Sequence, residues 1–202
     1  VTIKLSDEGF YNVIVGCTDM GTGCDTIIAQ FVADSLDTDI DNIAVFGVDT
    51  DTSPYDSGSY ASSTTYLTGM AAVKAAEQMR EKLLQLAAKI LEEDITKLEF
   101  DGKRVFCEET GKEVSLFDLA TASMVNNEIA LEVTYSHSSP VSPPPFMAAC
   151  AEVEVDPETG AIELLDYTAC VDCGTVVNTN LARVQTEGGL LQGIGMTLYE
   201  DI

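Results

Sequence analysis

The chain has 202 residues, of which 46% are apolar and 22% charged, a composition typical of a globular protein that excludes wholesale disorder. With 34 acidic against 10 basic residues, the formal net charge of -24 disfavours nucleic acid and anionic membrane surfaces as partners. No apolar run approaches the roughly 20 residues of a membrane helix, and no signal peptide is visible.

The cysteines indicate a reducing environment. Six cysteines are too few for a disulfide scaffold in a chain of this size, so we expect a cytoplasmic protein. Cys17, Cys150 and Cys170 lie in apolar stretches and are expected to be buried thiols. Cys170 and Cys173 form a single CxxC pair, which without a second pair gives little support for a structural zinc site.

The first third of the chain predicts two strands, a helix and a strand. Residues 1–17 are expected to form two strands joined by a turn. Thr22 followed three residues later by Asp25 has the capping-box pattern, so a helix should begin there and end within 37–41. A short strand is expected at 43–48. The acidic stretch before it fails the calcium-loop pattern, because its sixth position is not glycine.

The middle of the chain predicts a long loop, a long helix and a small hairpin. Residues 49–65 form the loop, and nine of these seventeen residues are Ser or Thr. The apolar spacing that follows predicts a helix over about 67–90. A hairpin is expected over 97–107, and Ser115 is expected to cap a short helix.

The last third begins with a Ser- and Pro-rich connector over 136–145. This connector is a candidate sub-domain boundary, but it is too short to divide the chain by itself. Strands at 146–155 and 161–171 should form a second hairpin, and a helix is expected from about residue 180 to the end. The recurring strands and helices predict an α/β (α+β) fold, with mixed sheets and helices packed on one face.

Two segments of the first half have the chemistry of a ligand site. The sequence Gly-Thr-Gly at 21–23 precedes a helix, where glycines let a ligand approach the backbone and the helix start offers N–H groups to an anion. Hydroxyl groups crowd residues 61–65, and no Lys, Arg or His occurs from Leu5 to Val73. An anion here would be held by backbone N–H groups and hydroxyls. Taken alone, each pattern is more typical of an ordinary helix start or a solvated loop.

The C-terminal helix is the third such segment, because four glycines fall inside it. Each interior glycine costs ~1 kcal/mol relative to alanine, so another helix or a flat ligand is expected to approach the backbone closely. Gln185 and Gln192 add neutral amides that suit a polar, uncharged partner. The four glycines are Gly188, Gly189, Gly193 and Gly195.

These segments follow one another in a distinctive order. Met-Gly-Thr-Gly at 20–23 and Ala-Ser-Ser-Thr-Thr at 61–65 precede Val-Asp-Cys-Gly-Thr-Val-Val-Asn at 171–178, which is followed by Ala-Arg-Val-Gln-Thr-Glu-Gly-Gly at 182–189 and Gln-Gly-Ile-Gly at 192–195. In this order and spacing they resemble the large, molybdenum-binding subunit of the molybdenum hydroxylases, the xanthine dehydrogenase and aldehyde oxidoreductase family. The resemblance covers essentially the whole chain.

The resemblance implies a molybdenum ion held by the dithiolene of a pterin (molybdopterin), in some members extended to a dinucleotide, with few or no metal ligands from the protein. Residues 20–23 would lie beside the pterin and the oxo groups of the metal, and residues 61–65 would line the pterin and its phosphate. Gln185 would hydrogen-bond the cofactor edge. The cofactor contacts implied in this way are Met20, Gly21, Thr22, Gly23, Ala61, Ser62, Ser63, Thr64, Thr65 and Gln185.

The chain departs from the family pattern in three places. Thr22 stands where the family usually has Gln, and its shorter side chain would lose the contact near the metal or make it through water. Ser63 stands where Arg is often found, which removes a cation for the phosphate. Thr179 replaces a frequent Pro, which changes only the start of the last helix.

The resemblance also implies a reaction and partners for the parent protein. A water-derived oxygen would enter a C–H bond of an N-heterocycle or aldehyde, and electrons would leave through iron–sulfur and FAD domains or subunits of a homo-oligomeric complex. The family's base is a Glu in a Gly-Glu-Pro context, and this triplet is missing here, as is an initial Met. Residues 1–202 are therefore expected to be an inactive fragment of a molybdopterin-binding domain. The alternative is a non-catalytic acidic interaction module that shares only the fold.

Overall fold

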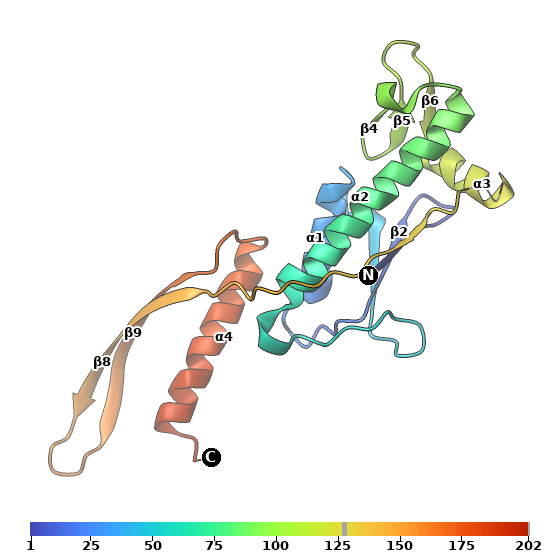
Figure 1. The fold of residues 1–202 in the computed structure, drawn as a ribbon. Coiled ribbons are helices and arrows are strands. Elements are labelled where there is room, and N and C mark those ends of the chain that lie inside the picture. Colours follow the sequence, from blue (N-terminus) through green and yellow to red (C-terminus); the bar gives the residue numbers. More distant parts are fainter. Residues whose placement is uncertain (127–128, 202) are drawn as a thin grey trace. The chain divides into compact units, whose positions relative to one another are not determined.

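The structure is a computed structural model that describes residues 1–126 and 129–201 (Figure 1). The chain divides into two compact units, Val1–Pro140 and Val141–Ile202, and the division falls within the Ser- and Pro-rich connector. No helix in the described part of the chain has both the length and the apolarity needed to cross a membrane. The two units are described separately.

A four-stranded mixed sheet forms the centre of the first unit. Its strand order is β3–β2–β1–β7, in which β1 lies antiparallel to both β2 and β7, whereas β2 and β3 run parallel. Along β2, Tyr11, Val13 and Val15 are fully buried and alternate with less buried residues, as expected for a sheet covered on one face. The strands are β1 (Thr2–Leu5), β2 (Tyr11–Val15), β3 (Ile43–Gly47) and β7 (Glu132–Thr134).

Two helices, α1 (Cys24–Ser35) and α2 (Thr64–Leu91), pack against the covered face of this sheet (Figure 1). Helix α1 buries Ile28 and Val32, while α2 buries a row of alanines whose small side chains allow close packing. The predicted strands, both helices and their order are therefore confirmed. So is the expected fold class of mixed sheets with helices on one face.

The predicted capping box at the start of α1 is wrong. The N-cap residue is Gly23 rather than Thr22, and no side chain caps the helix. Instead, Asp19 Oδ1 accepts hydrogen bonds from the amides of Gly21 and Gly23, at 2.9 and 3.1 Å. The carboxylate two residues before a glycine thus shapes this turn, and the Thr22 hydroxyl takes no part in it.

A small antiparallel sheet and a third helix complete the first unit. The predicted hairpin over 97–107 is confirmed, because β4 and β5 pair antiparallel. Ser115 Oγ accepts a hydrogen bond from the Asp118 amide at 3.1 Å, which confirms the predicted helix cap. These elements are β4 (Glu99–Phe100), β5 (Arg104–Phe106), β6 (Glu113–Ser115) and α3 (Leu116–Asn126), and the 3₁₀ turns are η1 (Ile40–Asn42), η2 (Tyr60–Ser62) and η3 (Ile95–Lys97).

The second unit consists of one hairpin and one helix. Strands β8 (Phe146–Val155) and β9 (Ile162–Asp172) pair antiparallel, and α4 (Thr179–Leu198) follows, both as predicted. The expectation of buried thiols at Cys150 and Cys170 is wrong, because both are exposed. Within the described residues β8 is exposed along its whole length, as expected for a two-stranded hairpin that no further layer covers.

Candidate cofactor-contact site

The parallel pairing of β2 and β3 brings two distant segments to one edge of the sheet. Helix α1 connects these strands, so the turn after β2 and the loop after β3 both leave from their carboxyl ends. In open α/β sheets, ligands bind in the crevice outside these ends. We call residues 16–25 and 48–65 together the strand-end site. It contains all predicted cofactor contacts of the first unit.

The two segments touch at Gly16. A Cβ atom on this glycine would lie 2.3 Å from the carbonyl oxygen of Pro54 and 2.7 Å from Cβ of Asp56, so a side chain would push the loop away. Asp56 in turn ties the loop to helix α2: its Oδ2 accepts from the Thr68 hydroxyl, and its Oδ1 accepts from the Gly58 amide, both at 2.8 Å. The site is therefore held from β2, the loop and α2 together.

The turn over residues 20–23 is shaped by a carboxylate. Gly21 and Gly23 have φ angles of +99° and +75°, which suit glycine, and both amides donate to Asp19 Oδ1. These hydrogen bonds, that from Gly21 above all, lower the pKa of the Asp19 carboxyl. The glycine amides expected to be offered to an anion are thus already directed at a side chain of the protein.

Thr22 lies between these glycines and has a distinctive environment. Its Oγ1 is buried and makes no hydrogen bond within the described residues. Burial raises the pKa of the neighbouring Cys24 thiol, and the Thr22 hydroxyl acts in the opposite direction. Next to it, the Met20 side chain is 70% exposed. A buried hydroxyl without a partner is costly, so it marks a place where a ligand could supply one.

The hydroxyl-rich loop adopts a strained backbone before α2. Ala61 and Ser62 have φ angles of 53° and 56°, in the left-handed region that residues with a side chain seldom occupy. Ser63 is 5% exposed and its hydroxyl lies 3.4 Å from the Gly58 carbonyl oxygen, a long contact. Thr64 donates to or accepts from the Ser59 hydroxyl at 3.0 Å. Thr65 is exposed at the start of α2.

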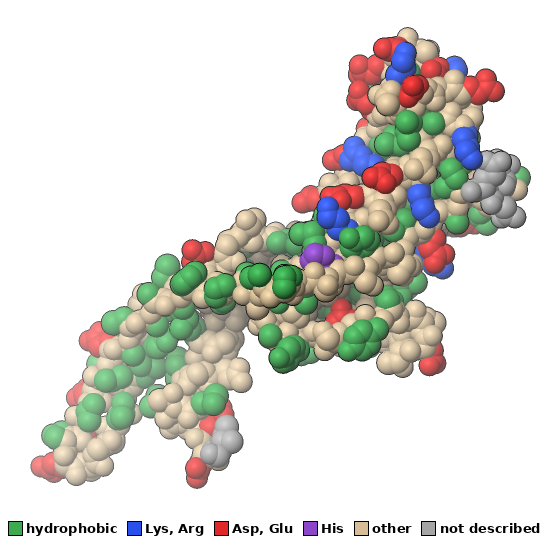
Figure 2. All heavy atoms as spheres, in the orientation of Figure 1, with side chains coloured by type: hydrophobic (Ala, Val, Ile, Leu, Met, Phe, Trp, Pro, Cys, Tyr) green, Lys and Arg blue, Asp and Glu red, His purple; other side chains and the backbone are tan. Residues whose placement is uncertain are grey.

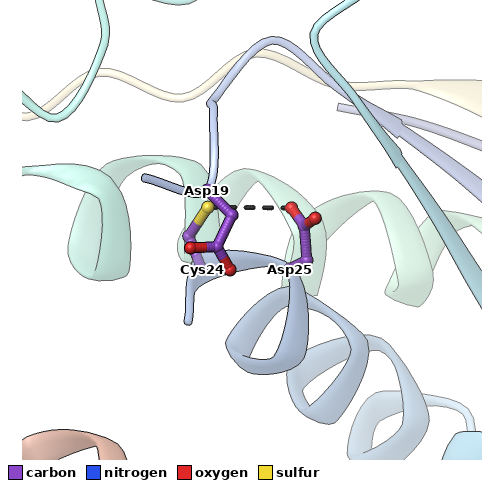
Figure 3. A group of neighbouring side chains, drawn as sticks. All are labelled: Asp19, Cys24 and Asp25. Atoms are coloured by element: carbon purple, nitrogen blue, oxygen red, sulfur yellow. Dashed lines mark hydrogen bonds between the residues drawn. The ribbon is translucent and has the colours of Figure 1, made fainter. Parts of the chain in front are cut away.

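Carboxylates and buried thiols, rather than cations, set the electrostatics of the turn. Burial raises the pKa of Cys17 to about 12 and also raises the pKa values of Cys24 and Asp25. Figure 3 shows Asp19, Cys24 and Asp25, whose potential ligand atoms lie within 4.8 Å of one another. The Cys24 thiol donates to Asp25 Oδ1 at 3.7 Å. A metal ion here would have to displace this proton, and we assign none.

The cations of the first unit lie elsewhere. Apart from Lys4, all lysines and arginines of this unit lie on α2 or within residues 97–112, the segment that contains β4 and β5, and Figure 2 shows these side chains in blue. Arg80, for example, pairs with Asp37 at 2.7 Å. No Lys, Arg or His belongs to the strand-end site. An anionic ligand would therefore meet neutral donors there.

Gln185 is the one predicted contact outside the first unit. It lies on α4 with an exposed side chain. Around α4, a Cβ atom added at Gly188, Gly189 or Gly193 would meet nothing within 4 Å in the described part of the chain. The expected close approach to these glycines is therefore not made within the second unit.

Sequence reasoning assigned no role to Asp19 and Asp56, although a signal was present. Both begin an Asp-x-Gly triplet, and in both the carboxylate accepts from the glycine amide. A third triplet at Asp172 behaves in the same way, with Gly174 N donating to its Oδ1 at 2.9 Å. The pattern is the usual signal of an Asx turn.

Comparison with known proteins places this fold in a family. Residues 1–202 match the model of the molybdopterin cofactor-binding domain. The chain is 37% identical over 201 residues to a probable hypoxanthine oxidase of Escherichia coli K12, covering 99% of this chain and 21% of that protein. It is 32% identical over 205 residues to the gamma subunit of the 6-hydroxypseudooxynicotine dehydrogenase complex of Paenarthrobacter nicotinovorans, covering 98% of this chain and 26% of that subunit.

A solved structure shows the same fold. The crystal structure of quinoline 2-oxidoreductase from Pseudomonas putida 86 matches with a TM-score of 0.84 and 26% identity, covering 100% of this chain and 26% of that chain. The chain thus spans about a fifth to a quarter of the length of these relatives. On the match along its whole length, the chain belongs to the molybdopterin cofactor-binding domain family of the molybdenum hydroxylase large subunits.

Proposed function

We propose that this chain holds part of a molybdenum–molybdopterin cofactor in an oxidoreductase that hydroxylates an N-heterocycle or aldehyde with water-derived oxygen. The observation that carries the proposal is the unpartnered, buried hydroxyl of Thr22 at the strand-end site. Family membership names the ligand that such a site would take. The names of two relatives, a hypoxanthine oxidase and a quinoline oxidoreductase, favour a nitrogen heterocycle as the substrate class.

The residues of the strand-end site fit such a cofactor in charge and chemistry. Thr22 would give its buried hydroxyl to the cofactor edge, and the hydroxyls of residues 63–65 would serve the phosphate, together with backbone donors of the 61–65 loop. Separately, Gln185 of α4 is proposed to hydrogen-bond the edge of the cofactor, as the family resemblance implies. Met20 would cover the cofactor, because its exposed side chain lies in the same turn.

When bound, the cofactor supplies the redox chemistry, and the protein supplies binding and orientation. The chain's own groups are suited to that division of work. Burial keeps the thiols of Cys17 and Cys24 protonated near neutral pH, so neither offers a thiolate to the metal. Asp25 is held next to Cys24 by the thiol that donates to it. The site therefore orients the cofactor without adding a competing soft ligand.

Turnover is proposed to belong to the full-length protein, together with iron–sulfur and FAD partners. The limited share of its relatives that the chain spans supports this, as does the description of one relative as a subunit of a complex. A homo-oligomeric assembly and a reducing, cytoplasmic location complete the proposal, the latter in line with the six free cysteines.

The proposal is tested with the full-length protein purified from its own host. Hypoxanthine, quinoline and an aromatic aldehyde are each incubated with it and a dye acceptor in ¹⁸O-labelled water. We expect dye reduction with at least one of them, and one labelled oxygen atom in the product. Protein from molybdate-starved cells serves as the control and should be inactive. Folded, molybdenum-loaded protein that oxidises none of these substrates would contradict the proposed substrate classes.

A further inference from the structure

We propose that Asp19 is a positioning residue, which sets the shape of the 20–23 turn before the cofactor binds and so directs the Thr22 side chain toward it. The inference rests on the proposed function. Its structural basis is a single carboxylate oxygen, Asp19 Oδ1, that accepts from the amides of both glycines in the turn, at 2.9 and 3.1 Å. Hydrogen bonds to an ionised acceptor are stronger than neutral ones.

These two hydrogen bonds determine what the turn can offer to a ligand. Gly21 and Gly23 occupy the left-handed region, and each points its amide at the carboxylate instead of leaving it for an anion. Thr22 is the residue between them, and its hydroxyl remains buried without a partner. The turn therefore contacts the cofactor through the Thr22 side chain, while its glycine amides are used internally.

The charges around the turn separate the roles of the two segments. Asp19 and Asp25 place two carboxyl groups next to Cys24, and the proximity of Asp19 contributes to the raised pKa of Asp25. A phosphate would be repelled by these groups. The 61–65 loop has no acidic residue, and its hydroxyls and backbone are the better place for the phosphate. Asp19 thus also favours one orientation of the cofactor, with its uncharged edge at Thr22.

The test uses four variants of the full-length protein. Asp19→Asn keeps an acceptor oxygen and removes the charge, Asp19→Ala removes both, and Asp19→Glu keeps the charge and moves the oxygen. Asp101→Ala is the matched control, because Asp101 Oδ1 also accepts from two amides, those of Lys103 and Arg104 at 3.1 and 3.0 Å, in the β4–β5 turn. Two quantities are measured: hydrogen–deuterium exchange over residues 18–26 in cofactor-free protein, and molybdenum and pterin content after dialysis.

We expect Asp19→Ala to speed exchange over residues 18–26 by about tenfold or more, as the loss of charge-assisted hydrogen bonds implies, and to lose most of the bound cofactor. Asp19→Asn keeps the acceptor oxygen but makes only neutral hydrogen bonds, so its exchange should fall between wild type and Asp19→Ala, and it should retain more cofactor than Asp19→Ala. Asp19→Glu should behave like the alanine variant, and it provides the test if Asp19→Ala does not fold. Asp101→Ala should change exchange only in its own turn and retain the cofactor.

Two results would overturn the inference. If Asp19→Ala exchanges and retains cofactor like wild type, Asp19 does not shape the turn. If Asp19→Asn loses as much cofactor as Asp19→Ala while its exchange stays slow, the charge acts on the cofactor directly and not by positioning. Wild-type protein that carries neither molybdenum nor pterin would instead contradict the proposed function, and the exchange measurement would still judge the role of Asp19 in the turn.

Discussion

The proposed function depends most on one atom, the hydroxyl oxygen of Thr22. A buried hydroxyl without a hydrogen bond costs about 1–3 kcal/mol, and Thr22 Oγ1 has no partner among the described residues. The cofactor-free protein would be more stable without this hydroxyl. A hydrogen bond between the hydroxyl and a bound cofactor would remove the cost and so favour binding. The two effects of one substitution should therefore have opposite signs.

Thr22→Val removes the hydroxyl and keeps the shape of the side chain. We expect the cofactor-free protein to unfold at a higher temperature, by an amount that corresponds to about 1 kcal/mol, and the purified protein to retain less molybdenum and pterin than wild type. Thr22→Ser keeps the hydroxyl and should retain the cofactor. A valine variant that is less stable without cofactor and retains it fully would show that the hydroxyl has no such role.

Cys17 gives a prediction on alkaline pH. Burial raises its pKa to about 12 in the folded protein, whereas an unfolded chain ionises the thiol near ~8.5. Below pH ~8.5 the thiol is neutral in both the folded and the unfolded state, so the stability that the buried neutral thiol contributes to the folded protein is fully present. As the pH rises further, only the unfolded state ionises, so this contribution is lost progressively up to the folded pKa.

The unfolding temperature should therefore fall more steeply between pH 8 and 10 in wild type than in Cys17→Ser, which has no group titrating in this range at that position. Cys150→Ser is the control, because Cys150 is exposed, and it should keep the wild-type slope. Parallel curves for wild type and Cys17→Ser would contradict the buried, neutral state of Cys17.

For single residues, the sequence predicted which segments carry ligand-binding residue types, but it predicted the role of each residue less well. The Gly-Thr-Gly turn and the hydroxyl loop were identified, but Thr22 was expected to cap a helix and instead keeps a buried hydroxyl. Asp19 shapes the turn by accepting a hydrogen bond from the Gly21 amide, and only the Asp-x-Gly pattern could have indicated this role. Apolar neighbours in sequence could not show that Cys150 and Cys170 are exposed, because burial depends on layers outside a single hairpin.

Among the elements, the contact between α1 and α2 holds the hydroxyl loop in place, since α2 begins directly after that loop. Gly69 of α2 faces Phe31 of α1, and a Cβ atom on Gly69 would lie 2.6 Å from Cε2 of the ring. The phenylalanine would have to shift, and the helices with it. Glycine at this position therefore serves packing at the cost of helix propensity.

Gly69→Ala is expected to destabilise the protein by about 1–3 kcal/mol, the usual cost of overpacking, and to lower its unfolding temperature. The double variant Gly69→Ala/Phe31→Leu removes the ring and should recover part of the loss. Helix propensity alone predicts the opposite sign, a gain of about 1 kcal/mol. An increase in unfolding temperature for the single variant would therefore exclude the packing role.

Element order and type could be read from the sequence because apolar periodicity and turn residues act locally. Strand pairing could not: the parallel register of Tyr11 with Ile43 joins residues far apart in the chain, and nothing in either strand alone specifies it. This pairing creates the strand-end site. The family resemblance suggested that the 20–23 and 61–65 segments act together, and the sheet places the turn after β2 and the loop after β3 at the same edge.

At the scale of the whole molecule, the second unit exposes apolar side chains that no other described part of the chain covers. Several large apolar side chains of β8, β9 and α4 are exposed, among them Phe146 at 70% and Leu191 at 69%. Figure 2 shows apolar side chains, in green, on the surface of this unit. Exposed apolar surface of this kind marks an interaction site. From this and from the open space around the glycines of α4, we expect this helix to meet another surface in the full-length protein.

Gly188→Ala in the full-length protein tests this directly. A close approach to the helix predicts a lower unfolding temperature and less retained cofactor, because the added methyl group would meet the approaching surface. An isolated, solvated helix predicts the reverse, a gain of about 1 kcal/mol from helix propensity. A more stable variant with full cofactor content would contradict the close approach.

Binding of a molybdenum cofactor by this chain is tested most directly by the molybdenum and released-pterin content of the intact gene product, purified from its own host. We predict about one molybdenum and one pterin per chain. Correctly folded protein that contains neither would contradict it, and would leave an acidic interaction module that shares the family's fold as the better reading.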